Sequence, residues 1–211
     1  MDDIYCYAFV EDAPSKEVVV KLLEHRNESS SSSRRLCFVQ GFPSVMHGSG
    51  NLRKKCPSIL EMAKGGTPVI CLVDLDATSC AGVLLADWFS IQKGRKPAFP
   101  DGLVFRVAVR EVEAWIMADV RAWSSYIGIP AANFSNAPDE LSDPKQYLLN
   151  VIRKKGKKKI HAEMLPQGTA HVGPCYNEVL CKFVQTKWSP SRAAEHSPSL
   201  GRAIQSLQRL Q

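Results

Sequence analysis

The feature that most constrains the fold is an apolar run that ends abruptly on two aspartates. Residues 69–73 are all apolar, and Asp74 and Asp76 follow them. Such an uninterrupted run is typical of a strand that is buried on both faces, as in a parallel sheet. Because side chains alternate along a strand, we expect the two carboxylates to project on the same side, at the carboxyl edge where open α/β sheets place their ligands.

Two interpretations of this aspartate pair stay open. Two carboxylates on one side repel each other unless a positive charge lies between them, and Mg²⁺ supplies such a charge through oxygen ligands. Alternatively, Asp74 or Asp76 caps the helix that follows the strand.

Strand and helix patterns alternate along the first half of the chain. Strands are predicted at residues 4–10, 35–40, 68–73 and 103–109, and helices at 15–25, 52–63 and 80–91, with a further helix entered through Arg110 and Glu111. This alternation predicts an α/β fold with a mostly parallel four-stranded sheet flanked by helices. The polar serine run at residues 29–33 reads as a loop before the second strand.

The last third of the chain loses its strand patterns from about residue 138. Helices are predicted to start at Ser142 or Asp143, and over residues 174–186 and 197–210. We therefore expect two parts, an α/β domain over residues 1–130 and a helical C-terminal extension over residues 131–211 packed on it.

Composition narrows the classes of protein to consider. The 211-residue chain is 45% hydrophobic, and its formal net charge of +6 is compatible with an anionic partner such as nucleic acid. The N-terminus lacks the basic and apolar regions of a signal peptide, and no apolar stretch is long enough for a membrane span. The seven cysteines form no CxxC pair and no zinc-ligand spacing. We expect a cytoplasmic protein with no membrane partner, disulfide or structural zinc.

Further carboxylates follow the first and fourth predicted strands. Glu11 comes directly after the first strand, at the same sheet edge as the aspartate pair, where it could complete a metal shell or act as a general acid or base. The alternative is a solvated loop acid. Glu111 and Glu113 flank the apolar face of the next helix, and Glu111, nearer the strand, is the better candidate to face the site. Glu113 and Asp119 could equally be solvated charges.

These residues carry a resemblance to a known family. A glutamate after the first strand, Asp-Leu-Asp after the third and Arg-Glu-Val-Glu-Ala-Trp after the fourth resemble the Toprim fold, and most closely the Toprim-like proteins related to nucleases associated with OLD-type ATPases in prokaryotic defence loci. Later segments also resemble this group: Gly48–Leu52, Asp143–Lys145, Gly173–Asn177 and Ser197–Leu200. Asp12-Ala13-Pro14-Ser15 stands where the family has a Gly-x-x-Asp tail.

The resemblance implies a chemistry for the acidic residues. In Toprim enzymes the glutamate and the Asp-x-Asp pair bind Mg²⁺ and serve phosphodiester cleavage or transfer. By position this implies that Glu11, Asp74 and Asp76 bind Mg²⁺ or Mn²⁺, with Glu111 as an added ligand or catalytic group. A separate ABC-type ATPase as partner and a role in antiviral defence are implied in the same way.

The densest charge on the chain is a basic run near the end of a predicted helix. It contains Arg153, Lys154, Lys155, Lys157, Lys158 and Lys159. Such a run attracts phosphates independently of base sequence. It could equally be a solvated helix end with Gly156 as the C-cap, because cations are favourable there.

The leading hypothesis is a Mg²⁺-dependent nuclease or related phosphodiester-processing enzyme of the Toprim class. The alternative is a non-catalytic module that binds a metal, a nucleotide or nucleic acid and serves a separate ATPase, since this sequence contains no P-loop. A third hypothesis, an enzyme acting on a nucleotide phosphate, is mildly disfavoured by the basic run.

Overall fold

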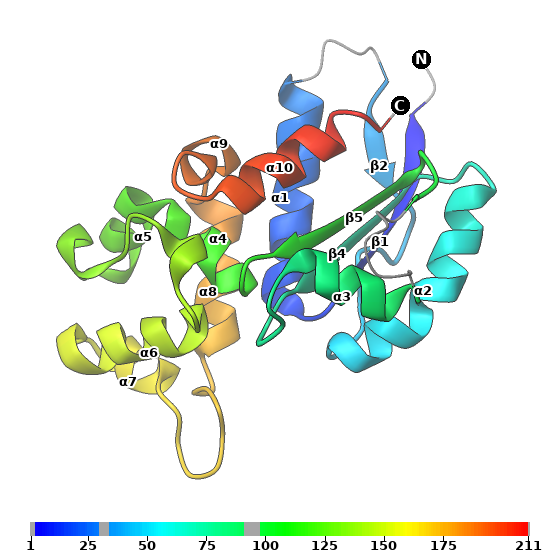
Figure 1. Cartoon of the computed structure of the whole chain (residues 1–211). Helices are drawn as coiled ribbons and strands as arrows, with labels where there is room; N and C mark the ends of the chain where they lie inside the picture. Colours follow the sequence, from blue (N-terminus) through cyan, green and yellow to red (C-terminus); the bar gives the residue numbers. More distant parts are fainter. Residues whose placement is uncertain (1–2, 30–33, 91–97, 211) are drawn as a thin grey trace.

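The computed structural model describes residues 3–29, 34–90 and 98–210, and these form an α/β fold around a parallel sheet (Figure 1). The strands are β1 (Ile4–Val10), β2 (Leu36–Phe38), β3 (Ser44–Val45), β4 (Val69–Asp74) and β5 (Leu103–Ala108). Their order is β2-β1-β4-β5, and β3 also pairs with β1. The predicted fold class and the four predicted strands are confirmed, and β3 adds a fifth that is too short to leave a periodic pattern.

All the strand pairs are parallel, so the carboxyl ends of the strands meet at one edge of the sheet. Val10 of β1 pairs with Leu72 of β4, and Asp74 of β4 pairs with Ala108 of β5. From β1 the chain first adds β2 and β3 on one side and then adds β4 and β5 on the other. The strand order therefore reverses between β1 and β4, and such a switch point is where open α/β sheets bind ligands.

Both faces of the sheet are covered by helices, which explains the uninterrupted apolar run of β4. On one face, Ile70 and Leu72 belong to a core shared with α1 (Ala13–Ser29), α4 (Val112–Ala118) and α10 (Pro198–Leu207). On the other face, Cys71 and Val73 pack in a second core with α2 (Ser49–Lys64) and α3 (Ala81–Trp88). All six residues of β4 are buried.

The described residues after β5 form helices and no strand, as the sequence predicts. Beyond α4 these helices gather on the left in Figure 1, and α8 packs along α1. They are α5 (Val120–Ile127), η1 (Ala131–Asn133), η2 (Pro138–Glu140), α6 (Pro144–Lys155), α7 (Lys159–Met164), α8 (Tyr176–Thr186) and α9 (Pro190–Ala194). Their apolar side chains join the first core without a break, and the division at residue 130 stays a prediction.

Helix α4 lies at the junction of the sheet and these helices and has no solvent-facing side. All seven of its residues are buried. The indole Nε1 of Trp115 donates to Ser199 Oγ at 2.6 Å, and Trp188 Nε1 donates to the carbonyl of Trp115 at 3.1 Å. The reading of Glu113 and Asp119 as solvated charges is wrong, because the C-terminal helices cover the side of α4 that the sequence pattern assigned to solvent.

Two sequence-based expectations fall outside the part of the chain that can be described. Residues 30–33 of the predicted serine loop and residue 91 of the third predicted helix are not among the described residues. Within the described ranges, no helix has the length and hydropathy needed to cross a membrane.

Candidate functional site

A cleft of about 450 Å³ lies at the carboxyl edge of the sheet, where β1 and β4 end. It is lined by Glu11, Asp12, Ala13, Val45, His47, Gly48, Asp74, Asp76, Lys145 and Asn177. The three residues for which the sequence predicts metal binding, Glu11, Asp74 and Asp76, thus line one cleft at the topological switch point.

Glu11 is fixed in this cleft by the neighbouring strand. Its Oε1 accepts a hydrogen bond from the backbone N–H of Asp74 at 2.9 Å, and the residue is only 8% exposed. Burial raises the pKa of Glu11 to about 7, and the carboxylates of Asp76 and Asp12 act in the same direction. The reading of Glu11 as a solvated loop acid is therefore wrong. The positive charge near the Glu11 carboxylate is too small to offset its burial and the neighbouring acids.

Asp74 is both a helix cap and a cleft residue. Its Oδ1 accepts a hydrogen bond from the backbone N–H of Val112, the first residue of α4, at 2.9 Å. Burial, followed by the nearby carboxylates of Glu113, Asp12 and Glu11, raises its pKa well above the ordinary value. The predicted cap on the helix that follows the strand is not found, because α3 has Cys80 at its N-cap without a side-chain hydrogen bond, and Asp74 instead holds the first N–H of α4.

Asp76 reaches the cleft by a different route from the one the sequence suggested. Strand β4 ends at Asp74, and Asp76 lies in the following turn with a φ of 50°. Its backbone N–H donates to the carbonyl of Arg110 at 2.9 Å, which ties this turn to the segment after β5. Its side chain is exposed and lines the cleft, so strand alternation does not explain its direction.

Lys145 places a positive charge beside these acids, from the first turn of α6. Its Nζ lies 3.2 Å from Glu111 Oε1 and 3.5 Å from Glu113 Oε1, and its backbone N–H donates to Glu111 Oε2 at 2.9 Å. Burial alone would lower the pKa of Lys145, but the carboxylates of Glu113, Glu111 and Asp74 raise it above its usual value. Lys145 is thus a protonated ammonium group at neutral pH.

Glu111 and Glu113 act on Lys145 and do not line the cleft themselves. Both carboxylate oxygens of Glu111 accept hydrogen bonds from Lys145. Glu113 is 1% exposed, and its Oε1 also accepts from the hydroxyl of Tyr176 at 3.2 Å. Burial raises the pKa of Glu113 to about 7, against the opposing effect of Lys145.

Lys145 carried a signal that the sequence interpretation did not use. A cation in the first turn of a helix is unfavourable against the helix dipole, so a lysine directly after the predicted cap and proline implies a nearby anion. Glu113 carried no such signal, because an acidic residue on a short helix normally reads as surface.

The oxygen donors in the cleft are of the kind that hard divalent cations prefer. Glu11 Oε2 and Asp74 Oδ2 each remain free of the backbone hydrogen bonds that engage the other oxygen. As arranged, no three His, Cys, Asp or Glu side chains of the described residues form a group that could hold a metal ion. Mg²⁺ needs no such cage, because it is commonly bound through one or two carboxylates and several waters.

The basic run lies away from the acidic cleft, at the other end of α6. Arg153, Lys154 and Lys155 form the last turn of α6, and Gly156 is its C-cap. Ten residues separate Lys145 from Lys155, which is about 15 Å along a helix.

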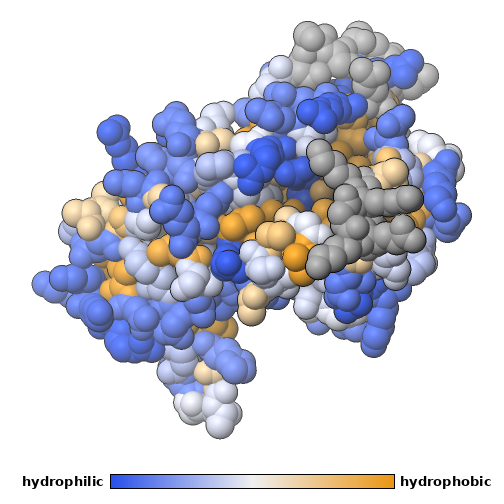
Figure 2. Space-filling model, viewed as in Figure 1, coloured by the Kyte–Doolittle hydropathy of each residue, from blue (hydrophilic) through white to orange (hydrophobic). Residues whose placement is uncertain are grey.

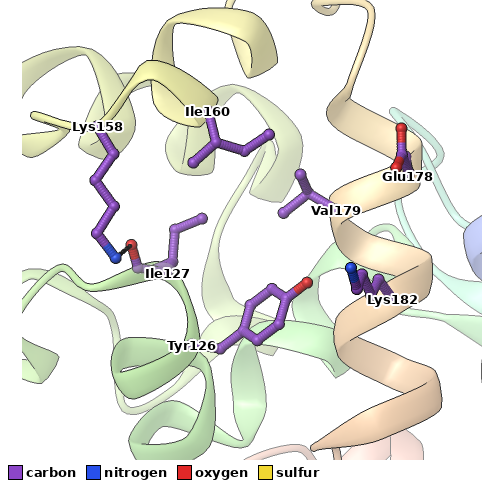
Figure 3. Close-up of a pocket in the computed structure, with 7 residues that line it drawn as sticks. All are labelled: Tyr126, Ile127, Lys158, Ile160, Glu178, Val179 and Lys182. Carbon is purple, nitrogen blue, oxygen red and sulfur yellow. Dashed lines mark hydrogen bonds between the residues drawn. The ribbon is translucent and has the colours of Figure 1, made fainter.

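The cations of the basic run are not equivalent. Arg153 donates to Asn150 Oδ1 at 2.7 Å, and Lys159 lies 3.5 Å from Glu163. Lys158 extends into a pocket between α5, α7 and α8, where its Nζ donates to the carbonyl of Ile127 at 3.3 Å (Figure 3). Lys154, Lys155 and Lys157 are exposed, and their side chains make no ion pair or hydrogen bond within the described chain.

Comparisons with protein-family models, with curated proteins and with solved structures return no match for this chain.

Proposed function

We propose that the chain is a Mg²⁺- or Mn²⁺-dependent phosphodiester-processing enzyme, a nuclease, that acts at the cleft between β1 and β4. The observation that carries the proposal is the joining of Glu11 and Asp74 across the topological switch point by the 2.9 Å hydrogen bond. Two buried carboxylates side by side in a cleft, both with raised pKa values, favour a cationic ligand.

Glu11, Asp74 and Asp76 are the residues that would hold the metal. Bound there, a divalent cation would polarise a phosphoryl oxygen and lower the pKa of a coordinated water. The hydrogen bonds from Asp74 N–H and Val112 N–H orient the two buried carboxylates before any ligand arrives. Asp76 is the exposed member of the three and lines the same cleft.

Lys145 supplies a fixed positive charge to the same cleft. Its ammonium group is held by Glu111 and Glu113, which restricts its motion without displacing it from the cleft lining. A preorganised cation stabilises the negative charge that develops on a phosphate during cleavage. In this arrangement Glu111 contributes through Lys145.

The substrate proposed for this site is a nucleic acid strand. Lys154, Lys155 and Lys157 present unpaired charge at the far end of α6, where a strand that leaves the cleft could be held by its phosphates. A cytoplasmic location, a separate ABC-type ATPase as partner and a role in antiviral defence belong to the same proposal and rest on the Toprim-like resemblance of the sequence.

The test is metal-dependent cleavage of labelled DNA and RNA by the wild type and by Asp74→Asn with Asp76→Ala. Asparagine keeps an oxygen acceptor for Val112 N–H, so the double variant should stay folded while it loses activity by at least about a hundredfold. Glu140→Gln, at an exposed position, is the control for the loss of a negative charge. Undiminished cleavage in the double variant would refute the proposal.

A non-catalytic binding module is the other outcome of the same experiment. Metal and nucleic acid would then bind the wild type without turnover, alone and with a neighbouring ATPase. The segment after Glu11 favours this alternative. Asp12 Oδ1 accepts a hydrogen bond from Ser15 N–H at 2.9 Å and so caps α1. Ser15, which is 1% exposed, stands where the Gly-x-x-Asp tail of Toprim proteins has its aspartate.

A further inference from the structure

A second polar cleft lies along the open edge of the sheet, on β5. Its volume is about 490 Å³, and it is lined by Phe99, Pro100, Asp101, Leu103, Val104, Phe105, Arg106, Ser206, Arg209 and Leu210. Four consecutive strand residues line it although they alternate between the two faces of the sheet, so the cleft runs along the strand's outer edge. Within the described residues, β5 has no strand partner on that side.

Two arginines, Arg106 and Arg209, line this cleft, and the charge of a third, Arg202, acts on Arg106. Arg106 projects from β5, and Arg202 and Arg209 come from α10 and the turn after it, which pack against β5. Burial and the positive charges of Arg202 and Arg209 lower the pKa of Arg106. In the view of Figure 2, strongly hydrophilic side chains gather over α10 above an apolar strip beside β5.

The protein supplies few acceptors for this charge. Arg106 Nη1 donates to Ser206 Oγ at 3.2 Å, and its Nε is buried with no hydrogen-bond partner among the residues that the structure describes. Neither Arg202 nor Arg209 forms an ion pair within the described ranges. Asp101, an exposed residue, is the acid among the lining residues. Internal contacts therefore do not account for the clustering of three like charges.

We propose that this cleft binds a phosphate ester with an apolar or aromatic group beside the phosphate, that is, a nucleotide, either free or within a single strand. Guanidinium groups match phosphate oxygens through paired hydrogen bonds, and a phosphate relieves the repulsion among three cations better than a singly charged carboxylate does. The volume far exceeds that of a bare anion and lies in the range of small-molecule sites. Phe99 and Leu103 offer the apolar wall on which a base could rest.

This site is separate from the acidic cleft, and the proposal does not rest on the hydrolytic function. The lining residues of β5 run from Leu103 to Arg106, which lies two residues, or about 7 Å, before the strand's carboxyl end at Ala108, and the two clefts share no lining residue. Binding can therefore be measured with divalent metals removed, when no cleavage at the acidic cleft interferes.

The experiment measures the binding of adenosine 5′-monophosphate by calorimetry and of a labelled single-stranded oligonucleotide by fluorescence anisotropy, both in the presence of a metal chelator. Arg202→Gln with Arg209→Gln should weaken binding at least about tenfold, because two of the three cations are removed. Both residues are exposed, so the variant is expected to fold. Arg121→Gln, an exposed arginine on α5, is the matched control and should leave affinity unchanged.

The results of these measurements either show whether the bound phosphate belongs to a free nucleotide or to a strand, or refute the proposal. Weakened binding of the mononucleotide alone identifies a free nucleotide as the ligand, and weakened binding of the oligonucleotide as well identifies a strand. The proposal is overturned if neither probe binds, if the double variant binds as the wild type does, or if acetate displaces the probe as effectively as inorganic phosphate.

Discussion

Replacing Glu11 by glutamine is expected to stabilise the protein at alkaline pH. Below pH 4.5, the ordinary pKa of a glutamate, the group is protonated in both the folded and the unfolded chain. Between pH 4.5 and about 7 the unfolded chain releases the proton and the folded protein retains it, so stability is lost as the pH rises through this window. At about 1.36 kcal/mol per pH unit, the loss amounts to about 3 kcal/mol above pH 7.

Glutamine removes this penalty and still offers an oxygen to the backbone N–H of Asp74. We expect Glu11→Gln to raise the free energy of unfolding by up to about 3 kcal/mol at pH 8 and to change it little at pH 4. Urea unfolding at both pH values, with Glu140→Gln as the exposed control, gives the two differences. Adding Mg²⁺ at pH 8 should narrow the gap, because a cation that binds the folded wild type stabilises it.

Two results would refute this reasoning. A variant that is less stable than the wild type at pH 8 would mean that the Glu11 carboxylate contributes favourably when ionised. A difference that does not change between pH 4 and pH 8 would show that the pKa of Glu11 is not raised in the folded protein.

Two further predictions concern the helical part. Replacing Lys154, Lys155 and Lys157 by glutamine should weaken the dependence of nucleic-acid affinity on salt concentration. The slope of log K against log salt concentration should become shallower by about 0.9 for each phosphate that the variant no longer neutralises. An unchanged slope would show that these lysines do not bind the strand. Arg192→Ala should lower the free energy of unfolding by about 2 kcal/mol. Asp119, 2% exposed, loses both hydrogen bonds from the guanidinium group and keeps only the N–H of Ser189 as a side-chain partner within the described residues. Chemical denaturation measures this effect, with Arg121→Ala as the exposed control. A decrease in the free energy of unfolding of less than about 0.5 kcal/mol would contradict the prediction.

The sheet and the position of the cleft could be predicted because their causes are local. The apolar run before Asp74 is explained by helices on both faces of β4, and a residue that follows a parallel strand must lie at the carboxyl edge. Glu11 and Asp74 therefore meet as the strand pattern implied. The parallel direction of the strands also follows from the alternation of strands and helices, but their order in the sheet does not.

The rest of the site could not be predicted because it depends on distant packing. Glu113 is buried by Tyr176, 63 residues further along the chain, and Lys145 reaches the acids from a helix that no strand pattern places. Asp76 lines the cleft through a turn with a positive φ, which the alternation of a strand does not describe. The basic run was visible, but its separation from the cleft by the length of α6 was not.

The enclosure of α4 has a consequence for how this sequence can change over time. A helix with a solvent face accepts many substitutions on that face, whereas each residue of Val112–Ala118 packs against protein on every side. The first N–H of α4 donates to Asp74, and the indole of Trp115 donates to Ser199. The polar residues around α4 must therefore keep hydrogen-bond acceptors at these positions. Drift should be slowest here, and this segment, together with the residues that end β4, is the signature by which distant relatives could best be sought.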